Sequence, residues 1–382
     1  MKKKVLFILP SFDIGGTTAS TRNLISVLDK QKYEMMVWAL NDFGILRKTY
    51  DDITLLKTCF TAQVLALEEW RMEKGFARRI IAALIRFTAN HFSRARSLLI
   101  QYAINKSIGN QYFDTVVACQ EGFTTEFTSH ISCNNLVAWV RCDYQRYFKA
   151  HKKREDSFYE KFNHIVCVSE QTCIGFIKIY PKLNNRTICI YNPQDSAFIL
   201  SQADIDDHDI RFKNDRATIV SVGRFSYVKR FVEIPSITRK LLDDGLDFTW
   251  YIIGNGEQES AITTAIKNQK VGDRVLLLGA KSNPLYYIKR ANLYVCLSSS
   301  EACPRVINEA KILGTPVIST NFPTVYEYLE DGVNGRIVQL EAMSQAIKEL
   351  LTDEQQYSNI KREINKFKFD NNALIKQLEI IL

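Results

Sequence analysis

The sequence predicts an α/β protein made of two doubly wound units in tandem. Apolar runs of strand length alternate with helical patterns through most of the 382 residues. The alternation is interrupted by an acidic segment after residue 195 and then starts again, and the chain is long enough for two domains with separate cores. Strand–helix alternation is typical of a parallel sheet with helices on both faces.

The first half of the chain contains six candidate strands. The initial run KVLFILP is predicted to be a buried strand, because it is too short and too soon polar for a signal peptide. The predicted strands are Val5–Leu9, Met35–Leu40, Gln63–Leu67, Thr115–Cys119, Leu136–Val140 and Ile165–Val168. Helical patterns lie between several of them, at Thr18–Leu28, Phe123–Ile131 and Glu170–Ile179.

The second half repeats the same alternation. The predicted strands are Thr218–Val222, Thr249–Ile253, Val275–Leu278, Leu293–Leu297 and Pro316–Ile318. The predicted helices are Phe231–Leu242, Glu257–Asn268, Asn283–Arg290 and Arg305–Leu313. The segment SQADIDDHDIRFKND is acidic and poor in aliphatic residues, so we interpret it as a linker and lead-in. The predicted domains are 1–195 and 196–356, followed by a helical segment over 357–382.

Composition indicates an ordinary globular protein, with 46% hydrophobic and 24% charged residues. No apolar run reaches the length of a membrane span, so we expect the protein in the cytoplasm. The nine cysteines form no C-x-x-C pair, and several lie in strand patterns. We therefore interpret them as reduced core residues rather than metal ligands or disulfides.

The net charge of +8 is concentrated in the first half, where residues 1–195 carry 27 Lys and Arg against 18 Asp and Glu. Within Arg71–Lys106, Glu73 is the sole acid, and apolar residues alternate with the basic ones at helical spacing. The basic residues are Arg71, Lys74, Arg78, Arg79, Arg86, Arg94, Arg96 and Lys106. One interpretation is a solvated helix packed on its own domain. The other is a surface for anionic lipid or a phosphate-bearing acceptor. Nucleic acid is not expected, because no compact basic and aromatic motif is present.

Unusual loops follow several predicted strands, at the edge where open α/β sheets bind ligands. After Leu9, Gly15 and Gly16 precede a helix that Thr17 or Thr18 can cap, and free N–H groups there would suit an anion or a sugar hydroxyl. This is not the G-x-G-x-x-G fingerprint, so no nicotinamide cofactor is indicated. After Val222, Arg224 and Lys229 lie on one loop and match the needs of a departing diphosphate.

The next loops repeat this arrangement. GNGEQE follows Ile253 and contains Gly254 and Asn255, and Gly279 ends the strand after that. The stretch SSSEACPRVINEA then places Glu301 on a loop and Glu309 inside the helix expected to begin near Pro304. At 1.5 Å per residue, Glu309 lies roughly 7–8 Å along the axis from Pro304, so the two carboxylates can reach different parts of one extended ligand.

These motifs, taken in order, resemble the C-terminal half of glycosyltransferase family 4, whose retaining enzymes have the GT-B fold. The order is strand-GR-x4-K, G-N-G-E, strand-G, S-x-x-E-x7-E-A and G-x-P-V-I, over residues 217–338. The resemblance implies two Rossmann-like doubly wound domains facing across a cleft, with the acceptor bound by the first and the nucleotide sugar by the second. It also implies that the final segment crosses back to the first domain.

The resemblance also implies roles for single residues. Arg224, Lys229 and Glu301 would be the catalytic residues, with Arg224 and Lys229 on the donor diphosphate and Glu301 on the donor sugar. Glu309 would bind the ribose. The other residues expected to contact the donor are Gly15, Gly16, Gly254, Asn255 and Gly279. The loop after Gly279 would hold the base. Backbone N–H groups for sugar and phosphate would come from Ala302, Cys303, Pro304, Arg305 and Val306.

Two departures from the family pattern concern the sugar pocket. The family commonly has E-G-F-G or E-G-F-P, and this chain has EACP, which restricts backbone freedom at Ala302 and Cys303. Many members carry V-H-x-D after a first-half strand, whereas this chain has AWVRCDY, with Arg141 at the histidine position and Asp143 retained. An arginine there could bind an acidic sugar or an acceptor phosphate, could mark a degenerate site, or could be a salt-bridged structural residue.

The sequence therefore predicts a retaining, metal-independent glycosyltransferase, with no cofactor beyond its nucleoside-diphosphate sugar, which we expect to carry uridine. The expected acceptor is a glycan or a lipid-linked acceptor of cell-surface polysaccharide synthesis. The Arg71–Lys106 segment suggests a peripheral position on the inner face of the cell membrane. Two alternatives remain open: a non-catalytic nucleotide-sugar-binding homologue, and a GT-B sugar-nucleotide epimerase.

Overall fold

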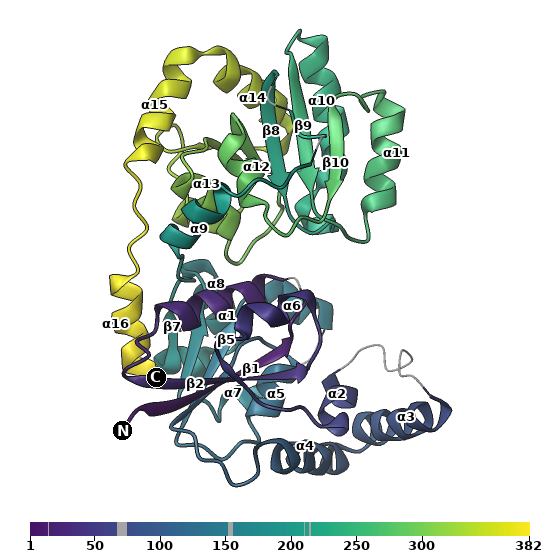
Figure 1. Cartoon of the computed structure of the whole chain (residues 1–382), viewed down its shortest axis with the longest axis vertical. Helices are drawn as coiled ribbons and strands as arrows, with labels where there is room; N and C mark the ends of the chain where they lie inside the picture. The colour runs from purple at the N-terminus through teal and green to yellow at the C-terminus, as the bar shows by residue number, and fades with distance from the viewer. Residues whose placement is uncertain (14, 67–74, 152–155, 210, 214) are drawn as a thin grey trace. The chain divides into compact units, whose positions relative to one another are not determined.

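The computed structural model describes residues 1–13, 15–66, 75–151, 156–209, 211–213 and 215–382. The chain divides into two compact units, Met1–Pro193 with Asn371–Leu382 (unit 1) and Gln194–Asp370 (unit 2). Each unit contains its own parallel sheet flanked by helices (Figure 1). Within the described residues, no helix is long and apolar enough to cross a lipid bilayer.

The sheet of unit 1 has seven strands in the described part of the chain, in the order β3-β2-β1-β4-β5-β6-β7. Neighbouring strands are parallel throughout, for example with Val5 beside Met35 and beside Thr115. Almost every residue in the middle of these strands is buried, because helices cover both faces. The strands are β1 Lys3–Ser11, β2 Tyr33–Asn41, β3 Thr54–Leu55, β4 Thr115–Ala118, β5 Asn135–Val140, β6 His164–Cys167 and β7 Thr187–Cys189.

The helices of unit 1 follow the predicted patterns in several places and depart from them in one. They are α1 Gly16–Val27, α2 Phe60–Ala66, α3 Phe76–His91, α4 Ser93–Ile108, α5 Phe123–Thr128, α6 Tyr144–His151, α7 Asp156–Tyr159 and α8 Glu170–Ile179. The predicted strand Gln63–Leu67 is wrong, because residues 60–66 form α2, and Leu67 lies outside the described residues. Val64 and Leu65 are both buried, and adjacent buried residues on a short helix look the same in the sequence as a buried strand.

The end of the chain is part of unit 1. In α16 (Asn372–Ile381), Leu378 and Ile381 are buried. The hydroxyl of Thr115 donates to the carbonyl of Leu382 at 2.9 Å, and the amide of Asn135 donates to the carbonyl of Ile381 at 2.8 Å. Two strands of unit 1 therefore satisfy the last carbonyls of α16, which a helix cannot satisfy by itself.

The sheet of unit 2 has six strands among the described residues, in the order β10-β9-β8-β11-β12-β13, and all neighbours are parallel. The strands are β8 Ala217–Val222, β9 Phe248–Ile253, β10 Val275–Gly279, β11 Leu293–Cys296, β12 Val317–Thr320 and β13 Arg336–Val338. The helices are α9 Ser196–Ala203, α10 Ile234–Asp243, α11 Glu259–Gln269, α12 Leu285–Arg290, α13 Arg305–Ile312, α14 Met343–Thr352 and α15 Glu354–Asn365.

The strand order places a topological switch point between β8 and β11. The connection after β8 runs outward to β9 and β10, and the chain then returns to add β11 on the other side of β8. In open α/β sheets, ligands bind outside the carboxyl ends of strands at such a point. The two loops that flank it follow Val222 and Cys296, and they carry Lys229 and Glu301.

Candidate functional site

Lys229 and Glu301 meet at the switch point of unit 2, although 72 positions separate them in the sequence. The Lys229 ammonium contacts Glu301 Oε1, and the Ser298 hydroxyl donates to the same oxygen at 2.6 Å. The side chains of Lys229 and Glu301 are 25% and 15% exposed, so the pair is largely withdrawn from water but still accessible. The structure therefore brings together two of the three residues predicted to be catalytic.

Backbone contacts between the two loops hold this pair in place. Ser299 N–H donates to the Val228 carbonyl at 2.8 Å, which joins the loop after β11 to the loop after β8. The Thr320 hydroxyl, at the end of β12, donates to the Ser298 carbonyl at 2.6 Å. Side chains on irregular loops are therefore positioned by the edge of a rigid sheet.

The electrostatic environment keeps Lys229 charged. Burial opposes the charge on the ammonium, but the adjacent carboxylate of Glu301 outweighs burial and raises the pKa of Lys229 above its ordinary value. A permanent cation at the carboxyl ends of β8 and β11 suits a ligand that carries negative charge.

Arg224, the third residue predicted to be catalytic, is exposed on the same loop as Lys229. Gly223 separates it from β8 and has a φ of 159°. A Cβ at Gly223 would lie 3.4 Å from Lys229 Cε, an ordinary van der Waals distance, so the positive φ rather than a lack of space favours glycine here.

The glycines of the loop after β9 allow two loops to approach each other. A Cβ at Gly254 would lie 1.9 Å from the Gly223 carbonyl oxygen, and one at Gly256 would lie 2.6 Å from that of Phe225. Both glycines have positive φ, which other residues rarely adopt. Gly254 and Gly256 therefore bring the loops of β8 and β9 together.

Hydrogen bonds then join three neighbouring loops into one rim. Phe225 N–H donates to the Asn255 carbonyl at 2.7 Å, and Gly254 N–H donates to the Gly279 carbonyl at 2.9 Å. The side chain of Asn255 is left exposed at this rim. Gly254, Asn255 and Gly279 thus lie at the same sheet edge as the Lys229–Glu301 pair.

Helix α13 begins directly after the loop of Glu301 and carries the second predicted glutamate. Arg305 Nη2 donates to Glu309 Oε1 at 3.1 Å, and the two side chains are 19% and 12% exposed. The Arg305 guanidinium also has a buried Nε–H with no partner among the described residues. Glu309 is therefore a buried carboxylate held by one neighbouring cation, not the solvated helix position that its spacing would also allow.

The structure narrows the set of backbone donors predicted at 302–306. Pro304 has no N–H, and Arg305 N–H donates to the Cys303 carbonyl at 2.8 Å. Two of the five positions are therefore unable to offer an N–H to a ligand in this conformation. Ala302 is buried and Val306 is half-buried on the first turn of α13.

Tyr328 is a neighbour of this motif that the sequence did not indicate. Its hydroxyl donates to the Cys303 sulfur at 3.1 Å, while its carbonyl accepts from the Lys311 ammonium at 2.7 Å. Ser298 was likewise not singled out, although the run SSSE before Glu301 could have suggested a hydroxyl partner for that carboxylate.

In unit 1, Gly15 and Gly16 lie at the N-terminus of α1, after β1. The predicted cap by Thr17 or Thr18 is wrong within the described residues: Gly15 is the N-cap, and the Thr18 hydroxyl donates instead to the Ser11 carbonyl at 3.2 Å. A Cβ on either glycine would meet no described atom within 4 Å, so both glycines border open space.

Arg141 is held by three elements of unit 1. Its guanidinium donates to the Cys119 carbonyl at 2.8 Å, the Ser20 hydroxyl at 2.7 Å and Asn192 Oδ1 at 2.6 Å. It thus links the end of β4, helix α1 and the last residues before unit 2. These hydrogen bonds favour the interpretation of Arg141 as a structural residue. Its side chain is half-buried.

Asp143 lies at the start of α6 and has a capping role. Its Oδ1 accepts from Arg146 N–H at 3.2 Å, three residues further on. A carboxylate that accepts an N–H three residues on is typical of a helix cap. Arg141 and Asp143 belong to unit 1, whereas Lys229, Glu301 and Glu309 belong to unit 2.

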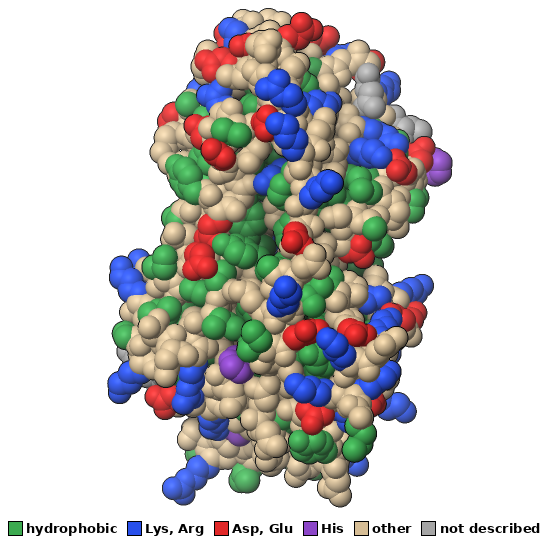
Figure 2. Space-filling view, turned by 90° about the vertical axis from the view of Figure 1, so that its left-hand side faces the viewer, with side chains coloured by type: hydrophobic (Ala, Val, Ile, Leu, Met, Phe, Trp, Pro, Cys, Tyr) green, Lys and Arg blue, Asp and Glu red, His purple; other side chains and the backbone are tan. Residues whose placement is uncertain are grey.

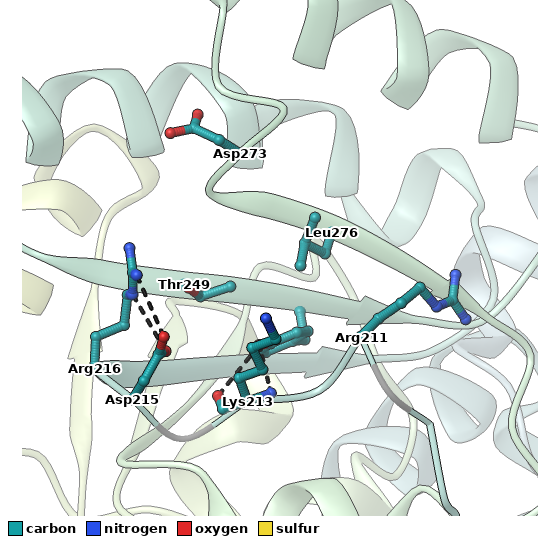
Figure 3. Close-up of a pocket in the computed structure, with 8 residues that line it drawn as sticks. Arg211, Lys213, Asp215, Arg216, Thr249, Asp273 and Leu276 are labelled. Atoms are coloured by element: carbon teal, nitrogen blue, oxygen red, sulfur yellow. Dashed lines mark hydrogen bonds and ion pairs between the residues drawn. The ribbon is translucent and has the colours of Figure 1, made fainter.

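A surface pocket elsewhere in unit 2 is not part of this arrangement. It is lined by Arg211, Lys213, Asp215, Arg216, Thr249, Tyr251, Asp273 and Leu276, largely at the starts of β8, β9 and β10 (Figure 3). Arg216 pairs with Asp215 in it, and Arg211 pairs with Asp209. The pocket therefore lies away from the switch point, and several of its charges are already neutralised. Among the residues that the structure describes, no cluster of three His, Cys, Asp or Glu could hold a metal ion.

Residues 202–367, which contain the whole Lys229–Glu301–Glu309 arrangement, match the model of the family Glycosyl transferases group 1. The resemblance to glycosyltransferase family 4, predicted from the order of the motifs, is thereby confirmed over these residues.

Curated relatives match part of the chain. It is 27% identical over 170 residues to N-acetyl-alpha-D-glucosaminyl L-malate synthase of Bacillus anthracis, over 43% of this chain and 44% of that protein. It is 28% identical over 142 residues to the lipopolysaccharide core biosynthesis glycosyltransferase LpsE of Rhizobium meliloti, over 36% of this chain and 41% of that protein. The matched regions span less than half of these relatives.

Solved structures match the chain over nearly its full length. Anabaena HepE in complex with UDP-glucose aligns with a TM-score of 0.73 over 99% of this chain and 98% of that one, at 16% identity. WaaG, a glycosyltransferase involved in lipopolysaccharide biosynthesis, aligns with a TM-score of 0.64 over 99% of each, at 15% identity. At such identity the likeness shows the fold alone, and it confirms the predicted GT-B class.

Proposed function

We propose that this protein is a retaining hexosyltransferase that moves a sugar from a UDP-sugar to a glycan or lipid-linked acceptor in the synthesis of a cell-surface polysaccharide. Unit 2 binds the nucleotide sugar and unit 1 binds the acceptor. One observation supports this most strongly: a charged lysine and a carboxylate meet at the switch point of unit 2, beside a helix that carries a second buried carboxylate. The UDP-glucose held by HepE supports uridine as the base.

Each of these groups has a task on an extended donor. Arg224 and Lys229 neutralise the diphosphate, Glu301 accepts hydrogen bonds from the sugar hydroxyls, and Glu309 accepts them from the ribose. Glu309 uses Oε1 for Arg305, so we assign Oε2 to the ribose. Charge-assisted hydrogen bonds of this kind fix orientation as well as affinity.

The reaction breaks the bond between the sugar C1 and the oxygen of the β-phosphate, and that oxygen leaves with the bonding electron pair. The acceptor hydroxyl oxygen then forms the new bond to C1 on the same face, and its proton passes to the departing diphosphate. Negative charge therefore grows on the leaving diphosphate in the transition state, where Lys229 and Arg224 stabilise it. No step requires a metal ion.

The acceptor lies against unit 1 in this proposal. Gly15 and Gly16 offer an uncrowded helix N-terminus, at which the positive end of the helix dipole favours an oxygen of the substrate. Arg141 orders the end of β4 and the residues before unit 2 through the hydrogen bonds of its guanidinium. We assign it a positioning role, and Asp143 a supporting one at α6.

The test is a transfer assay with UDP-sugars and simple alkyl glycosides as acceptors, without added metal. The expected result is acceptor-dependent release of UDP, and an NMR coupling constant showing that the new linkage keeps the donor's anomeric configuration. Lys229→Ala is expected to lower kcat about 100- to 1,000-fold, the usual loss for one group that stabilises transition-state charge. An inverted linkage, or equal turnover in Lys229→Ala, would contradict the proposal.

A further inference from the structure

Helix α3 of unit 1 presents apolar side chains to water along one face. Phe76, Ile80, Leu84 and Phe87 follow each other at spacings of four, four and three, so they share one side of the helix. All four are exposed, Phe76 to 81%. We call these four residues the α3 stripe. An uninterrupted apolar stripe on a helix normally faces a core, so its exposure requires a partner.

The other side of α3 already packs on unit 1. Ala82 and Ala89 are buried, and the Arg86 guanidinium donates to the carbonyls of Val64 and Leu65 at 3.2 and 3.3 Å. Figure 1 shows α3 extending outward from the rest of unit 1, in line with α4. The contacts that fix the helix therefore leave the α3 stripe available.

The surroundings of the α3 stripe are basic. No Asp or Glu occurs in the sequence between Glu73 and Asp114, so α3 and α4 together carry Arg78, Arg79, Arg86, Arg94, Arg96 and Lys106 and no acid. Glu126 on α5 does face α4, where it pairs with Arg96. On the face drawn in Figure 2, by contrast, acidic and basic side chains lie together. Arg71 and Lys74, also predicted for this surface, lie outside the described residues.

On α4, Arg94, Leu98, Tyr102 and Lys106 follow at intervals of four, so one line of that helix carries an apolar and an aromatic side chain with a basic one at each end. Leu98 is 71% exposed and Tyr102 is 56% exposed. Apolar and aromatic residues bordered by arginine and lysine form the pattern of a helix that lies in the interface of an anionic bilayer.

From this exposed, acid-free pairing of apolar and basic residues we propose that α3 docks unit 1 onto an anionic lipid bilayer. The α3 stripe enters the boundary between headgroups and acyl chains, and the arginines lie among the lipid phosphates. A second copy of the chain fits less well, because a twofold contact would place the same basic surface against itself without a compensating acid.

The test is sedimentation of the full chain with vesicles of phosphatidylcholine alone and of phosphatidylcholine mixed with phosphatidylglycerol. We expect binding to the mixed vesicles that weakens with salt. Leu84→Glu puts a carboxylate into the α3 stripe and is expected to lower the bound-to-free ratio about tenfold. The matched control is Ile45→Glu, another exposed apolar residue of unit 1, and it should bind as wild type does.

A second pair of changes separates charge from apolar insertion. Arg79→Gln with Arg94→Gln should weaken binding to mixed vesicles and reduce its dependence on salt, whereas Leu84→Glu should weaken binding at every salt concentration. Arg86 is left unchanged because it holds α3 on α2. The melting temperature of each variant checks that it folds.

Three results would overturn this proposal. Folded wild-type protein could fail to sediment with mixed vesicles, or Leu84→Glu could bind as tightly as wild type. Light scattering could instead show a dimer that Leu84→Glu converts to a monomer, which would assign the α3 stripe to a second copy. None of these measurements uses a nucleotide, so their outcome is independent of the donor site.

Discussion

Replacing Glu309 by alanine removes a carboxylate to which we assign a hydrogen bond from the ribose. A hydrogen bond to a charged group contributes about 1.5–3 kcal/mol, so Glu309→Ala should weaken UDP binding roughly 10- to 150-fold. The same change also strips Arg305 of its partner, and both side chains are largely buried. We therefore expect a loss of about 1–3 kcal/mol in the free energy of unfolding as well.

The matched control is Arg305→Met, which breaks the same ion pair but leaves the carboxylate in place. It should share much of the stability loss while keeping UDP affinity within a few fold of wild type. Calorimetric titration with UDP measures the affinity, and urea unfolding measures the stability. Comparing the two variants separates the role of Glu309 in binding UDP from its role in the ion pair that stabilises α13.

A change in the ligand makes the test sharper. The wild-type chain should bind 2′-deoxy-UDP about tenfold more weakly than UDP. Glu309→Ala should bind the two ligands equally, because the carboxylate that accepts from the 2′-hydroxyl is absent from this variant. Unchanged UDP affinity in a folded Glu309→Ala would refute the assignment. Undiminished discrimination between the two ligands in that variant would refute it too.

Three further predictions concern other charged residues. Lys229→Ala should weaken UDP binding roughly tenfold or more, since it removes the cation held at the ends of β8 and β11, and affinity equal to wild type would contradict this. Arg141→Lys should lower the free energy of unfolding by about 1–3 kcal/mol, because an ammonium is unable to replace the hydrogen bonds of the guanidinium to Cys119, Ser20 and Asn192. A change below about 0.5 kcal/mol in urea unfolding would contradict this. Burial lowers the pKa of Lys311 from 10.5 to about 8. Between these two pH values the unfolded chain binds more protons than the folded chain, so the stability of the wild type rises with pH. The stability of Lys311→Met relative to wild type should therefore be about 2 kcal/mol greater at pH 7 than at pH 10. The same relative stability at both pH values would contradict this prediction.

The secondary structure could be predicted where a pattern was long or had a clear end. The helix predicted at Glu170–Ile179 agrees with α8, whose start is marked by Ser169 accepting from Thr172 N–H. Short elements carried too little pattern. Edge strands β3 and β7 were not predicted, and residues 60–66 were taken for a strand because a few buried neighbours suit either structure.

The site could be predicted as a set of loops, but not as a set of contacts. Parallel strands place all their following loops at one edge of the sheet, so the sequence was sufficient to put Lys229 and Glu301 on that edge. Their meeting depends on β11 lying next to β8, an order that the alternation of strands and helices leaves open. The same limit applies to Arg141, whose partners come from three distant parts of the chain.

The most direct test of the account is the melting temperature of the purified chain with a panel of nucleoside diphosphates and sugar nucleotides, without added metal. A ligand that binds the folded state raises this temperature. We predict a rise with uridine diphosphate and its sugars that is absent from Glu309→Ala. No shift with any nucleotide, at concentrations well above ordinary donor affinities, would contradict the central claim that unit 2 binds a nucleoside-diphosphate sugar.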